Sequence, residues 1–325
     1  MIKFFRQSYA IQYVVIALLA IALWIPSFLA GKVAVGWDSP VTPLYNLINR
    51  ILGFSPFVQL LFAFLLMLLE ALIFNTILVN NQIIGKVSTM GAFVFVLLMN
   101  LTRTQANFFP FALSVVFILL VFSALFSIYL VQKPELDLLR TGIFVALASM
   151  CYFPAIVLIV WVIIALQIAK KVSLRLGLIP LVGFFSVYFF YFVGVYLFGD
   201  FLPMIHEYRD WFMNLKFSVS GFNTCIVLLL VFLFASAFLL VFGNSNLEKT
   251  VAVRVKMTMT MLLLLFGILL LFMGGNVLMN GLVFIVLAIV FSYAFTYLSN
   301  PGWANLVLSL FMLLVIANHY YFKLL

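Results

Sequence analysis

Acidic residues are scarce in this chain: Asp and Glu account for 8 of its 325 residues, and charged residues of both signs for only 8%. A soluble domain of this length carries roughly a quarter charged residues, so the composition excludes an ordinary soluble protein. Cysteine and histidine are equally rare, with two of each. Their positions match neither a metal-binding spacing nor a disulfide framework.

Several common functional motifs are also missing. The sequence has no Walker loop, no dinucleotide-binding fingerprint and no nucleophile elbow. These absences exclude phosphate-driven pumping and redox chemistry with a soluble cofactor. We therefore expect no cofactor and no metal.

What the chain has instead is long apolar runs. It is 67% hydrophobic, with 39 phenylalanines, and runs of about 20 apolar residues match the hydrocarbon thickness of a bilayer. The sequence predicts an all-α, polytopic transmembrane helical bundle with about 10–11 membrane helices, forming a single integral membrane domain over 1–325. The expected apolar segments are 10–30, 57–79, 88–101, 110–131, 141–169, 176–198, 222–243, 257–273, 279–299 and 302–321.

The segment 141–169 needs a separate interpretation because a single helix of that length would measure about 43 Å. As one tilted span, it would place the basic cluster at 170–175 on the outer face. Pro154 disfavours helical geometry in the residue before it. We therefore predict a short helical hairpin whose two ends lie on the same side, in preference to a single crossing.

Loop charge predicts the topology. Basic residues accumulate in cytoplasmic loops, and Lys3 and Arg6 precede the first apolar run. A cytoplasmic N-terminus and the hairpin together place eleven of the 17 basic residues inside. We expect a multi-pass protein of the bacterial inner membrane. The net charge of +9 is then a property of these loops, and no nucleic acid partner is expected.

Two gaps on the predicted outer side resemble interfacial helices. Near 40–53, apolar residues recur at helical spacing around Arg50. This helix would start at Ser39 and Pro40, and Asp38 stands just before them. Near 201–214, apolar residues alternate with polar ones that include His206 and Arg209. Asp38 is either an electrostatic partner of the helix start or a catalytic carboxylate facing a lipid-borne substrate. His206 and Arg209 lie either on a solvated face or in a substrate site.

Glu70 differs from the other acids because it lies in the middle of an apolar run. A carboxylate inside a membrane is costly and by default indicates function. The alternative is a protonated, structural acid that is hydrogen-bonded to Asn75, Gln59 or Asn100. Polar residues that could continue a path to both faces are few, which favours the structural interpretation.

Two stretches carry a resemblance to known families. The opening MIKFFRQSYAIQYVVIALLAIALWIPSFL and the segment LLRTGIFVALASMCYFPAIVLIVWVIIALQIAKKVSLRLGLIPLVGFF resemble an uncharacterised multi-spanning inner-membrane family of Bacteroidota. The second segment is more distantly similar to type C glycosyltransferases, which use polyprenyl-phosphate carriers. That resemblance implies a catalytic acid in the first outer loop, at Asp38.

Three functions remain open on this basis. The first is an enzyme acting at the outer face on a lipid-linked substrate, with Asp38 as catalytic residue and Arg50, Arg103, His206 and Arg209 binding the substrate. The second is a transporter or proton-linked channel centred on Glu70. The third is a non-catalytic membrane subunit of a cell-envelope assembly. The expected partners are membrane lipids, including a lipid-phosphate carrier.

Overall fold

The computed structural model describes most of the chain as helices. The described residues are 2–7, 9–30, 42–52, 55–84, 88–100, 110–128, 134–169, 174–199, 201–213, 251–274, 280–297 and 301–317. Within them all regular secondary structure is helical, as predicted. The expected span 222–243, together with Asp38 and Arg103, lies outside the described residues.

The first helices form an antiparallel pair. The short α1 (Ile2–Phe5) leads into α2 (Ala10–Ala30), which packs against α4 (Pro56–Asn80). Asn75 near the end of α4 bonds to Tyr13 near the start of α2. Towards the other ends of the two helices, the rings of Trp24 and Phe64 meet edge to face. These contacts fix the opposite directions of the two helices.

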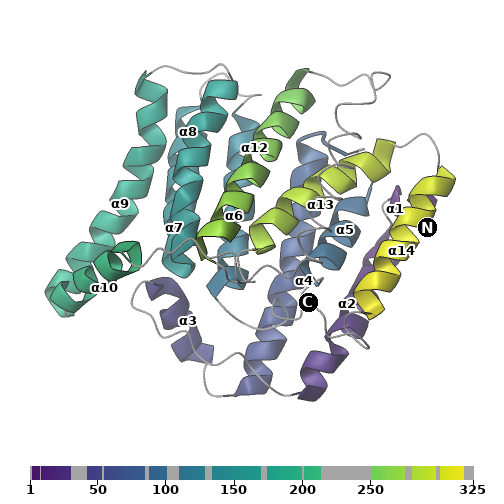
Figure 1. Cartoon of the computed structure of the whole chain (residues 1–325), viewed down its shortest axis with the longest axis horizontal. Helices are drawn as coiled ribbons and strands as arrows, with labels where there is room; N and C mark the ends of the chain where they lie inside the picture. Colours follow the sequence, from purple (N-terminus) through teal and green to yellow (C-terminus); the bar gives the residue numbers. More distant parts are fainter. Residues whose placement is uncertain are drawn as a thin grey trace.

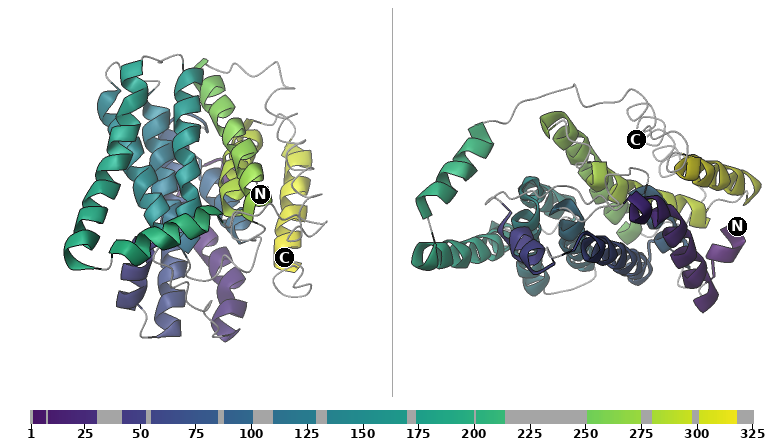
Figure 2. Two further views of the ribbon diagram at one scale, coloured as in Figure 1. Left: turned by 60° about the vertical axis from the view of Figure 1, so that its left-hand side comes forward. Right: turned by 90° about the horizontal axis from the view of Figure 1, so that it is seen from below.

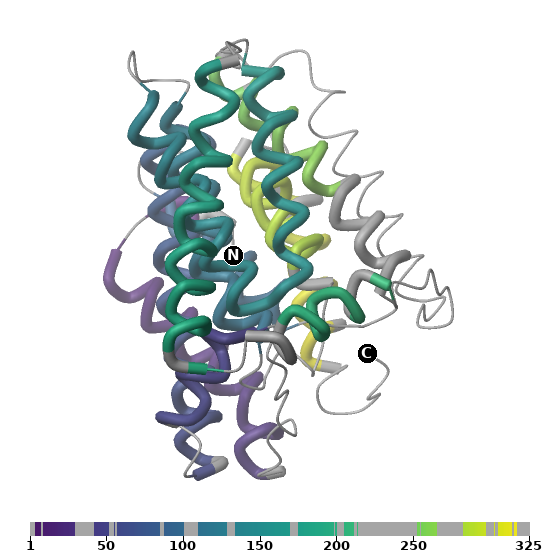
Figure 3. The backbone as a smooth tube through the Cα atoms, turned by 90° about the vertical axis from the view of Figure 1, so that its left-hand side faces the viewer, coloured from purple at the N-terminus to yellow at the C-terminus, as the bar shows by residue number. Residues whose placement is uncertain are grey.

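Four helices of the described chain are long and apolar enough to cross a membrane, and they make the chain a membrane protein. They are α2, α4, α6 (Pro110–Ser127) and α9 (Leu174–Phe198). Each agrees with a predicted span to within a few residues. Many of their large apolar side chains are exposed, particularly on α2 and α9, as expected where lipid covers the protein. Figure 3 shows α9 running along the outer side of the bundle.

The predicted hairpin is present. α7 (Glu135–Cys151) is followed by Tyr152, whose backbone is extended. A 3-10 turn (Phe153–Val157) comes next, and α8 (Leu158–Ile168) then runs back alongside α7. α6 and α7 meet where Ser127 bonds to Asp137. We call this end, at the top of Figure 1, the upper end; α4 and α6 finish there, and α7 and α9 begin. The opposite end is the lower end.

α7 and α9 run in the same direction and approach unusually closely. A Cβ atom built on Gly142 would lie 2.0 Å from the carbonyl oxygen of Pro180, and one built on Gly183 would lie 2.5 Å from that of Leu139. Only glycine permits such contact between the two backbones. Further along, the hydroxyls of Ser149 and Tyr188 are hydrogen-bonded at 2.8 Å. The hairpin is thereby fixed against α9.

Two helices at the centre of the bundle are nearly or completely enclosed by protein. All ten residues of α5 (Met90–Met99) are buried, as are residues 282–295 of α13 (Asn280–Tyr297). The two helices contact each other, and α5 also contacts α4. At about 15 Å, α5 is only half the length of a membrane crossing, so the segment 88–101 is not a full span. Its apolar sequence reflects burial in protein.

The remaining described helices complete the bundle. α12 (Val251–Gly274) contacts α8 and α13, and the indole of Trp161 in α8 donates a 3.0 Å hydrogen bond to the carbonyl of Met259. α14 (Pro301–Ala317) contacts α1 at the edge of the bundle.

Both predicted interfacial helices are present at the lower end. α3 (Pro43–Leu52) packs against α7, and α10 (Phe201–Met213) packs against α9. Figure 2 shows both helices in the lower part of the bundle. α3 begins at the pair Thr42-Pro43, three residues after the Ser39-Pro40 pair that the sequence favoured. Both pairs fit a helix start, so sequence alone does not choose between them.

Candidate functional site

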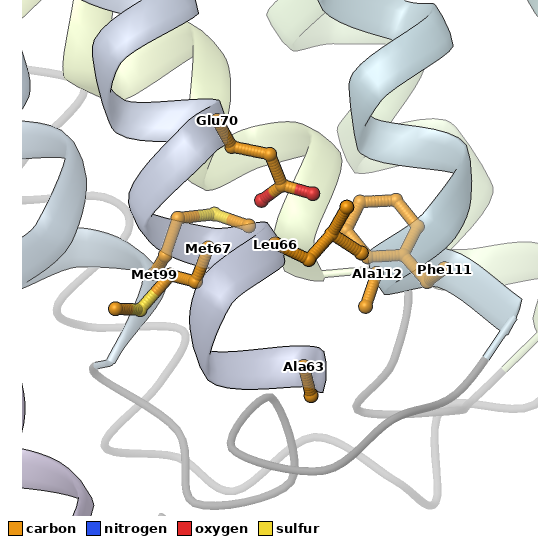
Figure 4. Close-up of a pocket in the computed structure, with 7 residues that line it drawn as sticks. All are labelled: Ala63, Leu66, Met67, Glu70, Met99, Phe111 and Ala112. Carbon is orange, nitrogen blue, oxygen red and sulfur yellow. The ribbon is translucent and has the colours of Figure 1, made fainter. Parts of the chain in front are cut away.

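Glu70 lies near the middle of α4 and is buried, with only 2% of its surface exposed. Its side chain points away from α4 towards the start of α6 (Figure 4). Among the described residues, no group forms a hydrogen bond with its Oε1 atom. A buried carboxyl oxygen without a partner is costly. Within the described part of the chain, α4 therefore holds a buried acid with one oxygen that lacks a hydrogen-bond partner.

The three partners expected from the sequence are engaged elsewhere. Asn75 donates to Tyr13 and to the carbonyl of Ser88, and its Oδ1 accepts the amide proton of Ala92. Gln59 donates to Asn49 of α3 at 3.1 Å. The idea that one of these side chains satisfies Glu70 is wrong, because their described bonds lead to other groups.

Asn100, the third expected partner, directly follows α5. Its Nδ2 donates to the carbonyl of Val96 at 2.7 Å and to the sulfur of Met67 at 3.1 Å. Its Oδ1, like Glu70 Oε1, is buried and has no partner among the described residues. Within the described residues, two buried oxygen acceptors thus lack a partner, one on α4 and one directly after α5.

A small cavity lies beside the Glu70 carboxyl group (Figure 4). Its volume is about 20 Å³, enough for one water-sized particle. Its lining residues come from α4, α5 and α6: Ala63, Leu66, Met67, Glu70, Met99, Phe111 and Ala112. Except for Glu70, this lining is apolar.

Helix ends meet at this cavity. α5 finishes at Met99, and α6 starts at Pro110, so Met99 and Phe111 bring a helix C-terminus and a helix N-terminus to the same cavity. The last carbonyls of a helix lack intrahelical partners and carry partial negative charge. The sequence identified Glu70 but not this arrangement, because α5 had the composition of a full span.

A second group of candidate residues lies at the lower end, on the two amphipathic helices. Arg50 of α3 is exposed. Tyr45 on the same helix is buried, whereas Leu47 and Ile51 are exposed. α3 thus has one face against protein and an apolar edge beside Arg50 that protein does not cover.

α10 has a comparable arrangement. His206 and Arg209 are exposed, and Arg209 forms a 3.6 Å ion pair with the neighbouring Asp210. Tyr208 on the opposite face packs edge to face against Phe153 of the hairpin turn. The Tyr208 hydroxyl is buried, which raises its pKa above the usual range. The hydroxyl therefore stays protonated. α10 thus packs Tyr208 against the hairpin turn and leaves His206 and Arg209 exposed.

Sequence reasoning missed one buried basic residue at the upper end. Lys256 directly precedes the expected apolar segment 257–273, which places it in a loop by sequence, but it lies in α12 with 1% of its surface exposed. Its Nζ donates to the backbone oxygen and to the Oδ1 of Asn81, at 3.0 and 3.2 Å. Asn81 caps the C-terminus of α4, where a positive charge is favourable. No short sequence pattern links these two residues, which are 175 positions apart.

Comparison of the chain with protein families, with curated proteins and with solved structures finds no match.

Proposed function

We propose that the lower end of the bundle binds a polyprenyl-phosphate-linked or similar lipid-linked molecule, on which the protein acts at the outer face of the inner membrane. The supporting observation is the pairing of exposed arginine with exposed apolar side chains on two amphipathic helices. Arg50 is accompanied by Leu47 and Ile51 on α3, and Arg209 by Ile205 on α10.

This combination suits a lipid with a phosphate headgroup. The guanidinium group makes paired hydrogen bonds to phosphate oxygens, and the neighbouring apolar side chains contact the hydrocarbon chain. In this proposal Arg50, His206 and Arg209 bind the headgroup. Asp38 is the catalytic acid and Arg103 a further phosphate ligand, as the sequence predicts.

Charge supports the proposed orientation. Among the described side chains, Arg140 and Arg175 lie near the starts of α7 and α9, and Lys256 bonds to Asn81 at the end of α4, so all three belong to the upper end. Arg50 and Arg209 belong to α3 and α10 at the lower end. Basic residues accumulate on the cytoplasmic side. The proposal therefore assigns the upper end and the N-terminus to the cytoplasm.

The binding of polyprenyl phosphate to the purified protein, measured by native mass spectrometry, tests the proposal. Removing a charged hydrogen bond costs about 1.4 kcal/mol, or about tenfold in affinity. We expect roughly that loss from Arg50→Gln and from Arg209→Gln. Arg175→Gln is the matched control because Arg175 is also exposed but lies at the start of α9. Wild-type affinity in the Arg50→Gln/Arg209→Gln double variant, or an equal loss in the control, would refute the proposed site.

The catalytic part has its own test. Asp38→Asn should retain lipid binding and lose sugar transfer from a polyprenyl-phosphate donor. Full transfer activity in that variant would remove Asp38 from the mechanism but leave the binding site standing.

A further inference from the structure

One side chain of α10 differs from the others that the structure describes in this helix. Six of these seven side chains are exposed: Ile205, His206, Glu207, Arg209, Asp210 and Met213. The seventh, Tyr208, is partly buried, and its hydroxyl oxygen is fully buried. Among the described side chains of α10, Tyr208 is therefore the one that anchors the helix to the bundle.

The aromatic ring of Tyr208 stabilises this contact. It meets the ring of Phe153, in the hairpin turn, edge to face with the ring centroids 5.1 Å apart. It meets the ring of Phe192 on α9 in the same manner at 6.3 Å. Edge-to-face rings attract each other because the positive edge of one faces the negative face of the other. The ring thus favours the observed position of α10, which we call the docked position.

The hydroxyl group of Tyr208 opposes docking. It has no hydrogen-bond partner among the described residues, whereas the hydroxyl of Tyr188 on α9 is bonded to Ser149 at 2.8 Å. Burying an unpaired hydroxyl disfavours the docked position by roughly tenfold in the equilibrium constant. Away from the hairpin turn, the hydroxyl would bond to water or to lipid headgroups, and tyrosine is favoured at that interface. The two parts of the Tyr208 side chain therefore act in opposite directions.

The link between α9 and α10 permits movement. α9 ends at Phe198 and α10 begins at Phe201, so two residues join them, and the first is Gly199. Glycine adopts backbone conformations that other residues avoid, which suits a hinge between two helices. α9 itself is fixed against α7 through Gly142 and Gly183. α10 can therefore turn at this link while α9 stays in place.

We propose that α10 is a movable arm that docks reversibly on the hairpin turn through Tyr208. In the docked state Tyr208 covers Phe153, which is only 3% exposed. In the undocked state α10 rests in the membrane interface as an amphipathic helix, and the hairpin turn is uncovered at the lower end. His206 and Arg209 move with the arm. The equilibrium is a property of the protein alone and does not depend on lipid binding at the lower end.

A distance measurement between spin labels tests the proposal. The full-length protein, in a variant without native cysteines, carries nitroxide labels on Glu207→Cys in α10 and Leu178→Cys in α9. Both positions are exposed. Double electron–electron resonance in liposomes gives the distribution of distances between the labels. We expect two distances, one for docked and one for undocked α10, and their areas give the ratio of the two states.

Variants of Tyr208 separate the effects of the ring and the hydroxyl. Tyr208→Phe keeps the ring and removes the unpaired hydroxyl, so the docked-to-undocked ratio should rise about tenfold. Tyr208→Ala removes the ring contacts, so the ratio should fall by about tenfold or more. Tyr9→Phe is the matched control because Tyr9 is exposed just before α2, and it should leave the ratio unchanged.

Two outcomes would overturn the movable arm. The first is a wild-type protein with the docked distance alone, which would make α10 a fixed part of the bundle. The second is an unchanged ratio in Tyr208→Ala, which would remove Tyr208 as the anchor. A ratio in Tyr208→Phe that equals or falls below that of the wild type would overturn the role of the hydroxyl. The lipid-binding experiment uses another ligand and other variants, so its result is independent of these.

Discussion

The glycine contact between α7 and α9 leads to a quantitative prediction about stability. In a helix interior, replacing Gly by Ala normally stabilises by about 0.5–1 kcal/mol. At Gly142 the added methyl would lie 2.0 Å from the carbonyl oxygen of Pro180, far inside van der Waals contact. The two backbones would have to separate, and such overpacking costs about 1–3 kcal/mol. Gly142→Ala should therefore destabilise the protein.

Gly183→Ala should have a similar but smaller effect because its added methyl would lie 2.5 Å from the Leu139 oxygen. Gly177 is the matched control: it lies in the same helix, and an added methyl there would have no neighbour within 4 Å. We expect Gly142→Ala to be less stable than Gly177→Ala by about 1.5–4 kcal/mol.

The measurement is equilibrium unfolding of the purified protein in mixed micelles, with increasing dodecyl sulfate and tryptophan fluorescence as the readout. Equal stability of the Gly142→Ala and Gly177→Ala variants would refute the close packing of α7 on α9. The same result would remove the main contact that fixes the hairpin in place.

Two further predictions concern the upper end and the orientation of the chain. Asn81→Leu should cost about 1.5–3 kcal/mol in the same unfolding assay, because it removes the Oδ1 acceptor of the buried Lys256 ammonium and leaves only the backbone oxygen. Lys256→Met should cost less because it removes the buried charge itself, and the reverse order would contradict this account. The orientation is tested with single cysteines in a variant without native cysteines. A cysteine that replaces Arg50 or Arg209 should react with a membrane-impermeant maleimide in intact spheroplasts, and one that replaces Arg140 or Arg175 should not. The opposite labelling pattern would invert the proposed topology.

The sequence predicted the helical segments well because a bilayer imposes a simple rule on them. A run of about 20 apolar residues forms a helix, and Pro154 with its neighbours breaks the run at 141–169, where the structure has the hairpin turn. The amphipathic helices α3 and α10 were also predicted, since their polar and apolar residues alternate with helical periodicity.

What the sequence could not provide is the surroundings of each helix. Lipid and protein interior both favour apolar side chains, so the composition of α5 could not reveal that protein encloses it. Glu70 was identified because it interrupts a run, but its unbonded oxygen depends on which way Asn75 and Asn100 point. Lys256 had the expected position of a loop residue, and only its distant partner Asn81 explains its burial.

The enclosure of α5 has a consequence for how the chain is assembled during synthesis. Ten apolar residues cannot hold a stable position across a bilayer by themselves, and α5 packs against α4 and α13. α4 precedes α5 in the chain and is made before it, but α13 begins at Asn280 and follows only after α6 to α12. Newly made chains therefore carry an incompletely covered α5 through most of translation. The final fold forms only when the last third of the protein closes over a segment made in the first third.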